Sequence, residues 1–134
     1  MNFNNFTTKS QEIIQLAQQL AQSYSHNQIE NEHIFKALKE VDENVLPFLL
    51  KKLNINTSLL KQLLEKQLQS FTKVSGAELI FSRETSKTLA EAAITAKSMK
   101  DEFVSIEHLV LAIFKSKSTI SQVLKDQGVT EKGL

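Results

Sequence analysis

Two acid–histidine pairs are the residues of this chain most able to do chemistry. Glu32 and His33 stand together in "NEHIFKAL", and Glu107 and His108 repeat the arrangement in "SIEHLVLAI". A carboxylate beside an imidazole could act as a general acid–base pair or begin a metal site. On a helix, however, neighbouring side chains point about 100° apart, and neither pair has the i, i+4 spacing of a helical metal site. We therefore interpret each pair as the start of a helix, while surface recognition and catalysis stay open as alternatives.

The residues around the second pair fit a helix start. Ser105 is a good N-cap, Glu107 then lies in the first turn against the positive end of the helix, and His108 begins the buried face. In the first copy Glu30 holds the equivalent cap position and is a poorer capping residue, with Asn31 as the alternative. The elements that position both pairs are therefore expected to be helices.

The rest of the sequence offers no clearer catalytic centre. His26 is predicted to be a polar loop residue, and a metal site shared by His33 and His108 is conceivable. There is no cysteine, no GxSxG nucleophile elbow and no GxxxxGK(S/T) phosphate-binding loop. We predict a chain that is not an enzyme and that has no metal and no cofactor of its own.

The composition is typical of a single soluble domain. In 134 residues, 41% are hydrophobic and 23% are charged, and 16 basic against 15 acidic residues give a net charge of +1. Because Arg83 is the only arginine and no basic excess exists, nucleic acid is not an expected partner. Apolar runs such as "VLPFLL" are too short to cross a membrane, and no signal peptide is visible, so we expect a cytoplasmic protein.

The spacing of apolar residues predicts an all-α protein, a helical bundle of about seven to eight helices. Sustained alternation with period two is missing, so no sheet of consequence is expected. The segment "TKVSGAE" carries Gly76 and favours a linker, which we place at residues 72–80. Helices are predicted at residues 7–25, 31–40, 45–53, 57–70, 83–100, 105–115 and 119–127.

The chain contains an internal repeat with an offset of 75 residues. The offset places Phe6 on Phe81, Glu32–His33 on Glu107–His108, and alanine on alanine three times. We infer one domain, residues 1–134, built from two pseudo-symmetric four-helix units: repeat one at 6–71 and repeat two at 81–134. Repeat one continues into "TSLLKQLLEKQLQS", whereas repeat two reaches "GVTEKGL". The last helix of repeat two is therefore expected to be truncated, and the chain to be a piece of a longer protein.

Apolar residues beside the predicted helix starts suggest a binding surface. Phe103 and Ile106 flank the second acid–histidine pair, and most residues of this kind close helix corners as hydrophobic staples. A cleft between the repeats could instead expose them in an apolar groove. Such a groove, rimmed by Asp101, Glu102 and Glu107, would suit weak binding of extended or unfolded peptide.

Three segments of the chain resemble a known family. "FTTKSQEIIQLAQQLA", "VLPFLLKKLNIN" and "KDEFVSIEHLVLAIF", together with the two-copy pattern, are similar to the N-terminal Clp repeat domain of ClpB-type AAA+ chaperones, the disaggregases. The likeness covers residues 3 to 134. It implies a non-catalytic module that engages unfolded or aggregated polypeptide and helps deliver it to the ATPase ring of the same chain. The alternative within the resemblance is an adaptor-docking domain of a ClpC/ClpA-type protease unfoldase.

The resemblance also implies partners and site residues. Family positions implicated in substrate binding fall here on Thr7, Asp101 and Glu107. The family often has a leucine where this chain has His108, so polar contacts are expected to weigh more at this edge. ATP and magnesium are expected only in the full-length protein, which would be a hexamer working with a DnaK-type chaperone system. The isolated domain is expected to be monomeric.

Overall fold

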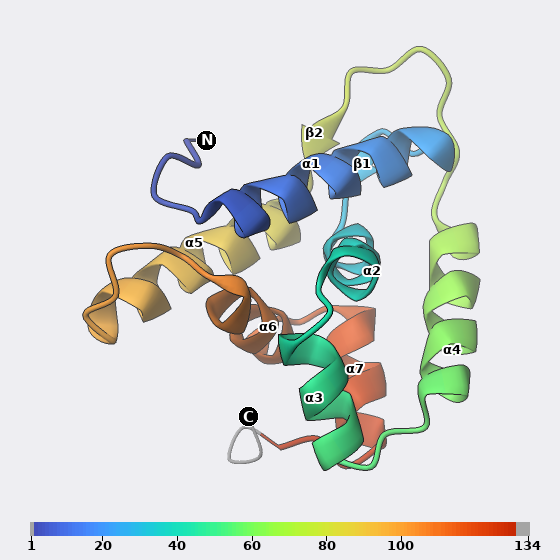
Figure 1. Cartoon of the computed structure of the whole chain (residues 1–134). Helices are drawn as coiled ribbons and strands as arrows, with labels where there is room; N and C mark the ends of the chain where they lie inside the picture. The colour runs from blue at the N-terminus through green and yellow to red at the C-terminus, as the bar shows by residue number, and fades with distance from the viewer. Residues whose placement is uncertain (1, 131–134) are drawn as a thin grey trace.

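The computed structural model describes residues 2–130, and within them the prediction of an all-α fold is confirmed. Seven helices and two very short strands follow one another along this part of the chain (Figure 1). Their bounds are α1 (Thr8–Ser23), β1 (Gln28–Ile29), α2 (Asn31–Val41), α3 (Val45–Lys52), α4 (Thr57–Ser70), β2 (Ile80–Phe81), α5 (Arg83–Ser98), α6 (Ile106–Lys115) and α7 (Thr119–Asp126).

Helices α1–α3 and α5–α7 are the two copies of the repeat. α1 and α5 have the same length and begin at matched caps: the hydroxyl of Thr7 accepts from the Ser10 N–H, and that of Ser82 accepts from the Thr85 N–H, both at 3.1 Å. α4 has no counterpart among residues 2–130. The predicted last helix of repeat two falls beyond Thr130 and so lies outside the described residues.

α1 and α5 both end earlier than the sequence suggested, and for the same reason. Ser25 and Lys100, which are 75 positions apart, adopt left-handed backbone angles with φ of 62° and 59°. The next N–H in each copy then turns back onto the helix, from His26 to the Ala21 carbonyl and from Asp101 to the Ala96 carbonyl, both at 2.9 Å. His26 and Asp101 therefore occupy the same position in the two repeats.

Two short parallel pairings join the repeats. β1 pairs with β2, with Ile29 opposite Phe81, and an isolated bridge pairs Phe6 with Val104. The second pairing is the first one with the repeats exchanged, as a pseudo-twofold axis requires. Because each paired segment is only one or two residues long, it leaves no alternating pattern in the sequence from which the pairing could be predicted. The prediction of no sheet of consequence is confirmed, but the role of these residues as a joint was missed.

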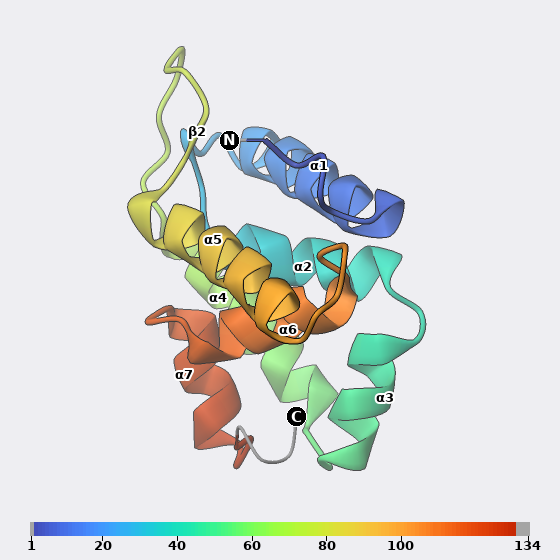
Figure 2. The same cartoon turned by 90° about the vertical axis from the view of Figure 1, so that its left-hand side faces the viewer.

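The core lies where α2 and α6 pack under the two longer helices. Figure 2 shows α1 and α5 crossing over α2 and α6, with α3 and α7 at the opposite end of the molecule. The alanines of the crossing faces are fully or almost fully buried, which lets the helix backbones approach closely. These residues are Ala17 and Ala21 in α1 and Ala92 and Ala96 in α5.

Candidate functional site at the junction of the repeats

Both acid–histidine pairs begin helices, as predicted. The Nδ1 atom of His33 accepts from the backbone N–H of Glu30 at 2.8 Å, and Nδ1 of His108 accepts from the N–H of Ser105 at 2.9 Å. Each imidazole is the third residue of its helix and reaches back to the cap residue, in the manner of a capping box. Glu30, rather than the alternative Asn31, is the cap in the first copy.

The other nitrogen of each imidazole contacts the third residue after the end of the preceding helix. Nε2 of His33 lies 2.8 Å from Nδ1 of His26, and Nε2 of His108 lies 2.8 Å from Oδ2 of Asp101. Since Nδ1 of each ring accepts a backbone N–H, the proton of the neutral ring is assigned to Nε2, which donates. The same scaffold position is therefore filled by a histidine in repeat one and a carboxylate in repeat two.

The histidine pair of repeat one is buried: His26 lies in a loop, as predicted, but its burial was not foreseen. Its side chain is only 5% exposed and stacks on Tyr24 with ring centroids 5.3 Å apart. Burial, with a contribution from His26, lowers the pKa of His33 to about 4, and burial also lowers the pKa of His26. Because the two rings are buried and are bonded to each other and to the Glu30 backbone, we interpret this site as structural.

Within residues 2–130, His33 and His108 each have both ring nitrogens engaged in contacts of their own repeat. Among residues 2–130 no group of three or more histidine, cysteine, aspartate or glutamate side chains could hold a metal ion.

Glu32 and Glu107 differ in exposure and in the groups from which they accept hydrogen bonds. Glu32 is 4% exposed and its Oε2 accepts from the N–H of Ile120 at 3.0 Å, at the start of α7, while burial raises its pKa. At the start of α3 that acceptor role is taken by Asp42, so Glu107 stays exposed and accepts from the Ser105 hydroxyl. The Asp42 carboxylate accepts hydrogen bonds from the backbone N–H groups of Asn44, Val45 and Leu46, at 2.9, 3.0 and 2.6 Å.

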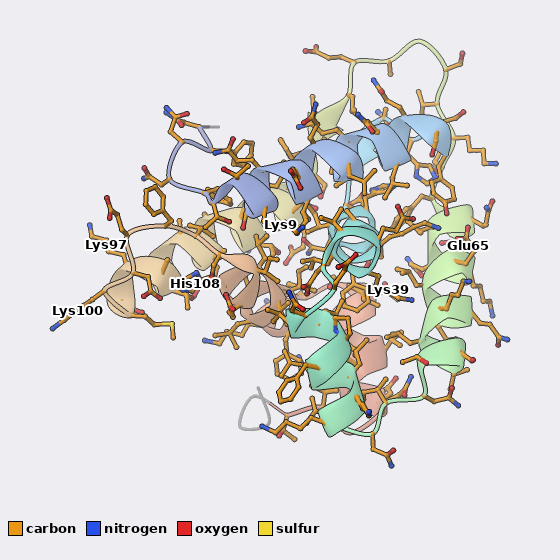
Figure 3. The ribbon with its side chains drawn as sticks, viewed as in Figure 1. Lys9, Lys39, Glu65, Lys97, Lys100 and His108 are labelled. Carbon is orange, nitrogen blue, oxygen red and sulfur yellow. The ribbon has the colours of Figure 1, made fainter. Side chains whose placement is uncertain are left out.

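An apolar groove of about 630 Å³ opens between α3 and α6, with Glu107 and His108 among its lining residues. Phe48 and Met99, two further lining residues, are 64% and 58% exposed. Figure 3 shows His108 on the same side of the molecule as Lys97 and Lys100 at the end of α5. The remaining lining residues are Asn44, Val45, Leu49, Val110 and Leu111.

Thr7 and the segment before α6 form a second candidate surface beside this groove. The Val104 N–H donates to the Asn5 carbonyl at 2.8 Å, and the Thr7 N–H donates to the Val104 carbonyl at 3.0 Å. The start of α1 is thereby fixed against the loop that leads into α6. We call residues 101–107, together with Thr7, the loop edge.

The structure brings all five sequence-predicted site residues to the loop edge but gives them different surroundings. Thr7 is half-buried and its hydroxyl serves the cap of α1, while Asp101 is held by His108. Phe103 is 47% exposed and so does not act as a buried staple, whereas Ile106 packs against the core. Glu107 is exposed and is the only one of the five that lines the groove.

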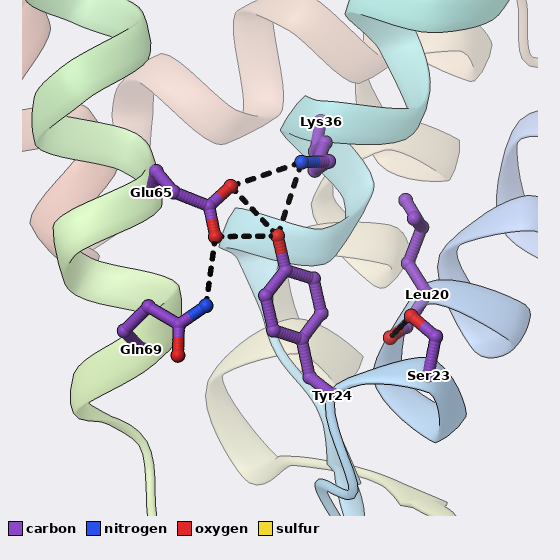
Figure 4. Close-up of polar contacts among 6 residues, drawn as sticks. All are labelled: Leu20, Ser23, Tyr24, Lys36, Glu65 and Gln69. Carbon is purple, nitrogen blue, oxygen red and sulfur yellow. Dashed lines mark hydrogen bonds and ion pairs between the residues drawn. The ribbon is translucent and has the colours of Figure 1, made fainter.

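A polar cluster that the sequence did not reveal seats α4 on repeat one (Figure 4). The Tyr24 hydroxyl donates to the Glu65 carboxylate at 2.7 Å, and Nζ of Lys36 lies 3.0 Å from both groups. At the matched positions 75 residues later stand Met99 and Leu111, which line the groove. The groove therefore occupies the place in repeat two that α4 covers in repeat one.

No helix in the described part of the chain is long and apolar enough to cross a membrane.

Comparisons with known proteins agree on one family. The model of the Clp repeat N-terminal domain matches residues 5–127. The chaperone protein ClpB of Bacteroides thetaiotaomicron is 48% identical over the whole chain, and that of Porphyromonas gingivalis is 39% identical over 98% of it. The chain spans only 16% and 15% of the lengths of these two relatives.

A solved structure shows the same fold. The Hsp104 N-terminal domain of Candida albicans superposes with a TM-score of 0.85 at 20% identity, covering 97% of this chain and 86% of that one. At this level of identity the likeness concerns the fold and not the function.

Proposed function

The chain belongs to the Clp repeat N-terminal domain family, in the form found in ClpB-type AAA+ chaperones, and from this premise we propose that it is a non-catalytic substrate-binding module of an ATP-dependent disaggregase. It engages unfolded or aggregated polypeptide at the loop edge and helps to deliver it to an ATPase ring. In a protein as long as the relatives, that ring belongs to the same chain, uses ATP and magnesium, and works as a cytoplasmic hexamer with a DnaK-type system.

The observation that carries the proposal is the exposure of Phe103 on a fixed loop. An aromatic ring that is 47% exposed can lie against apolar side chains of an extended polypeptide, and the anchored backbone beside it reduces the entropy lost on binding. Glu102 and Glu107 are exposed close to Phe103 in the chain, and their negative charge favours segments that carry lysine or arginine next to apolar residues.

The test is a titration of the ¹⁵N-labelled domain with a permanently unfolded polypeptide, reduced and carboxymethylated α-lactalbumin. We expect saturable amide shifts centred on Thr7 and residues 101–107. Phe103→Ala should weaken binding roughly fivefold, because aromatic anchors carry much of the energy of such contacts. Leu59→Ala is the matched control, since Leu59 is 40% exposed on α4, a helix that lies on the other side of the molecule from this loop in Figure 1.

Two outcomes would count against the proposal. An absence of shifts at high protein concentration would remove the binding function, and shifts centred elsewhere would remove the loop edge as its site. Binding to a folded adaptor protein, with none to the unfolded polypeptide, would favour the alternative of an adaptor-docking domain.

A further inference from the structure

One imidazole ties down the loop edge at two points. His108 is 4% exposed, and its Nε2 donates to Oδ2 of Asp101 at 2.8 Å while its Nδ1 accepts the N–H of Ser105 at 2.9 Å. Asp101 and Ser105 bound the last five residues of the loop between α5 and α6. The buried ring of His108 therefore holds both of these loop residues through hydrogen bonds.

Between these two residues a single residue of the loop is anchored to another element. Val104 is 2% exposed and is held on both sides by backbone bonds to Asn5 and Thr7. Glu102 and Phe103 make no hydrogen bond or ion pair to the described residues and are exposed. The position of the Phe103 ring is consequently set by anchors on either side of it, at Asp101 and at Val104.

Repeat one has a histidine in place of the carboxylate at the position that corresponds to Asp101. His26 takes the place of Asp101, contacts the equivalent His33, and is buried. In repeat two the Asp101 side chain is 50% exposed, and only its Oδ2 accepts a hydrogen bond from the described residues. Asp101 thus has both a hydrogen bond from His108 and an exposed charge. Its role in polypeptide binding is either to hold the loop through His108 or to contact the polypeptide with its charge.

We propose that Asp101 and His108 are positioning residues, a hydrogen-bonded clamp that holds the loop so that Phe103 is presented to bound polypeptide. This inference rests on the proposed function. Asp101 acts through His108 rather than by contacting the polypeptide with its charge. The bond needs only an acceptor oxygen at residue 101 and the Nε2–H of His108, so a neutral oxygen at residue 101 suffices.

Three variants separate the clamp from a direct charge contact. Asp101→Ala removes the acceptor and the charge, Asp101→Asn removes only the charge, and His108→Leu removes the donor while leaving the charge. With carboxymethylated α-lactalbumin as the probe, we expect Asp101→Ala and His108→Leu each to weaken binding about fivefold, and the double variant to lose no more than either single one. Asp101→Asn should retain nearly the affinity of the unmodified protein.

The opposite pattern would overturn the clamp: Asp101→Asn as weak as Asp101→Ala, with His108→Leu unchanged. His108→Leu perturbs the start of α6, so if it does not fold, the comparison of the two Asp101 variants alone decides. Amide hydrogen exchange gives a readout without polypeptide. Exchange at Val104 and Ser105, whose N–H groups donate to the Asn5 carbonyl and to Nδ1 of His108, should accelerate in Asp101→Ala and not in Asp101→Asn, and equal exchange in both would also refute the clamp. A protein that binds no polypeptide yet shows this exchange pattern would refute the proposed function and keep the clamp.

Discussion

At the scale of single residues, the buried pair of His26 and His33 makes stability depend on pH. The pKa of His33 is lowered to about 4 in the folded chain, against about 6.5 when unfolded. Between these values the unfolded state binds more protons, so the free energy of unfolding falls as pH drops from about 6.5 toward 4. We expect a loss of up to about 3 kcal/mol across this window, measured by urea unfolding at a series of pH values.

His26→Asp provides the matched test of this interpretation. The substitution copies the Asp101–His108 arrangement into repeat one, where the backbone around residue 26 has the same geometry. A carboxylate beside His33 favours the charged ring, so the pKa of His33 should rise and its share of the acid sensitivity should fall. NMR titration of the imidazole protons measures this, with His108 as the internal reference. A pKa of His33 that stayed near 4 would contradict the account.

At the scale of elements, helix starts are held by side chains that come from outside the helix. α3 depends on Asp42, a carboxylate that is 3% exposed and accepts three backbone N–H groups. Asp42→Ala leaves these donors without their acceptor and should lower the free energy of unfolding by about 1–3 kcal/mol in urea unfolding. Glu43→Gln, at the exposed neighbouring position, should change stability by less than about 0.5 kcal/mol.

The sequence predicted elements better than the contacts between them. Periodicity located all seven helices, and Ser105 with Glu107 identified the start of α6, because helix signals are local. The burial of His26 was missed, since its polar neighbours gave no sign that Tyr24 would cover it. Four of the site residues lie within seven positions of one another, and the repeat offset related this segment to repeat one. That Thr7 would meet Val104 depends on a bridge between segments almost a hundred residues apart, and the residues alone give no pattern for it.

At the scale of the whole molecule, the two repeats differ chiefly in what covers their outer face. In repeat one, α4 covers Tyr24 and Lys36 through Glu65. In repeat two, the matched Met99 and Leu111 line an open apolar groove. An exposed apolar surface of this size is typical of a face that another segment or a partner covers.

The segment that follows α7 makes the same turn as the segment that leads into α4. The Val129 N–H turns back to the Leu124 carbonyl just as the Ile55 N–H turns back to the Leu50 carbonyl. The residue after Ile55 is the cap of α4, and Thr130, the residue after Val129, is also a good capping residue. We therefore expect that, in a protein continued beyond residue 134, a helix completes repeat two by packing into the groove.

The absence of cysteine makes this expectation simple to test. Met99→Cys introduces a single thiol in the groove, and its reaction with a maleimide should be at least tenfold slower in a version extended by some twenty natural residues. Ile94→Cys, at a position 60% exposed on α5 and not among the groove residues, should react equally in both lengths. If the thiol of Met99→Cys reacts slowly in the extended version without added polypeptide, the groove is a surface on which the chain itself packs. The loop edge then remains as the site for polypeptide. Equal reactivity of Met99→Cys in both lengths would instead leave the groove open, and Phe48 would then join Phe103 as an apolar contact available to polypeptide.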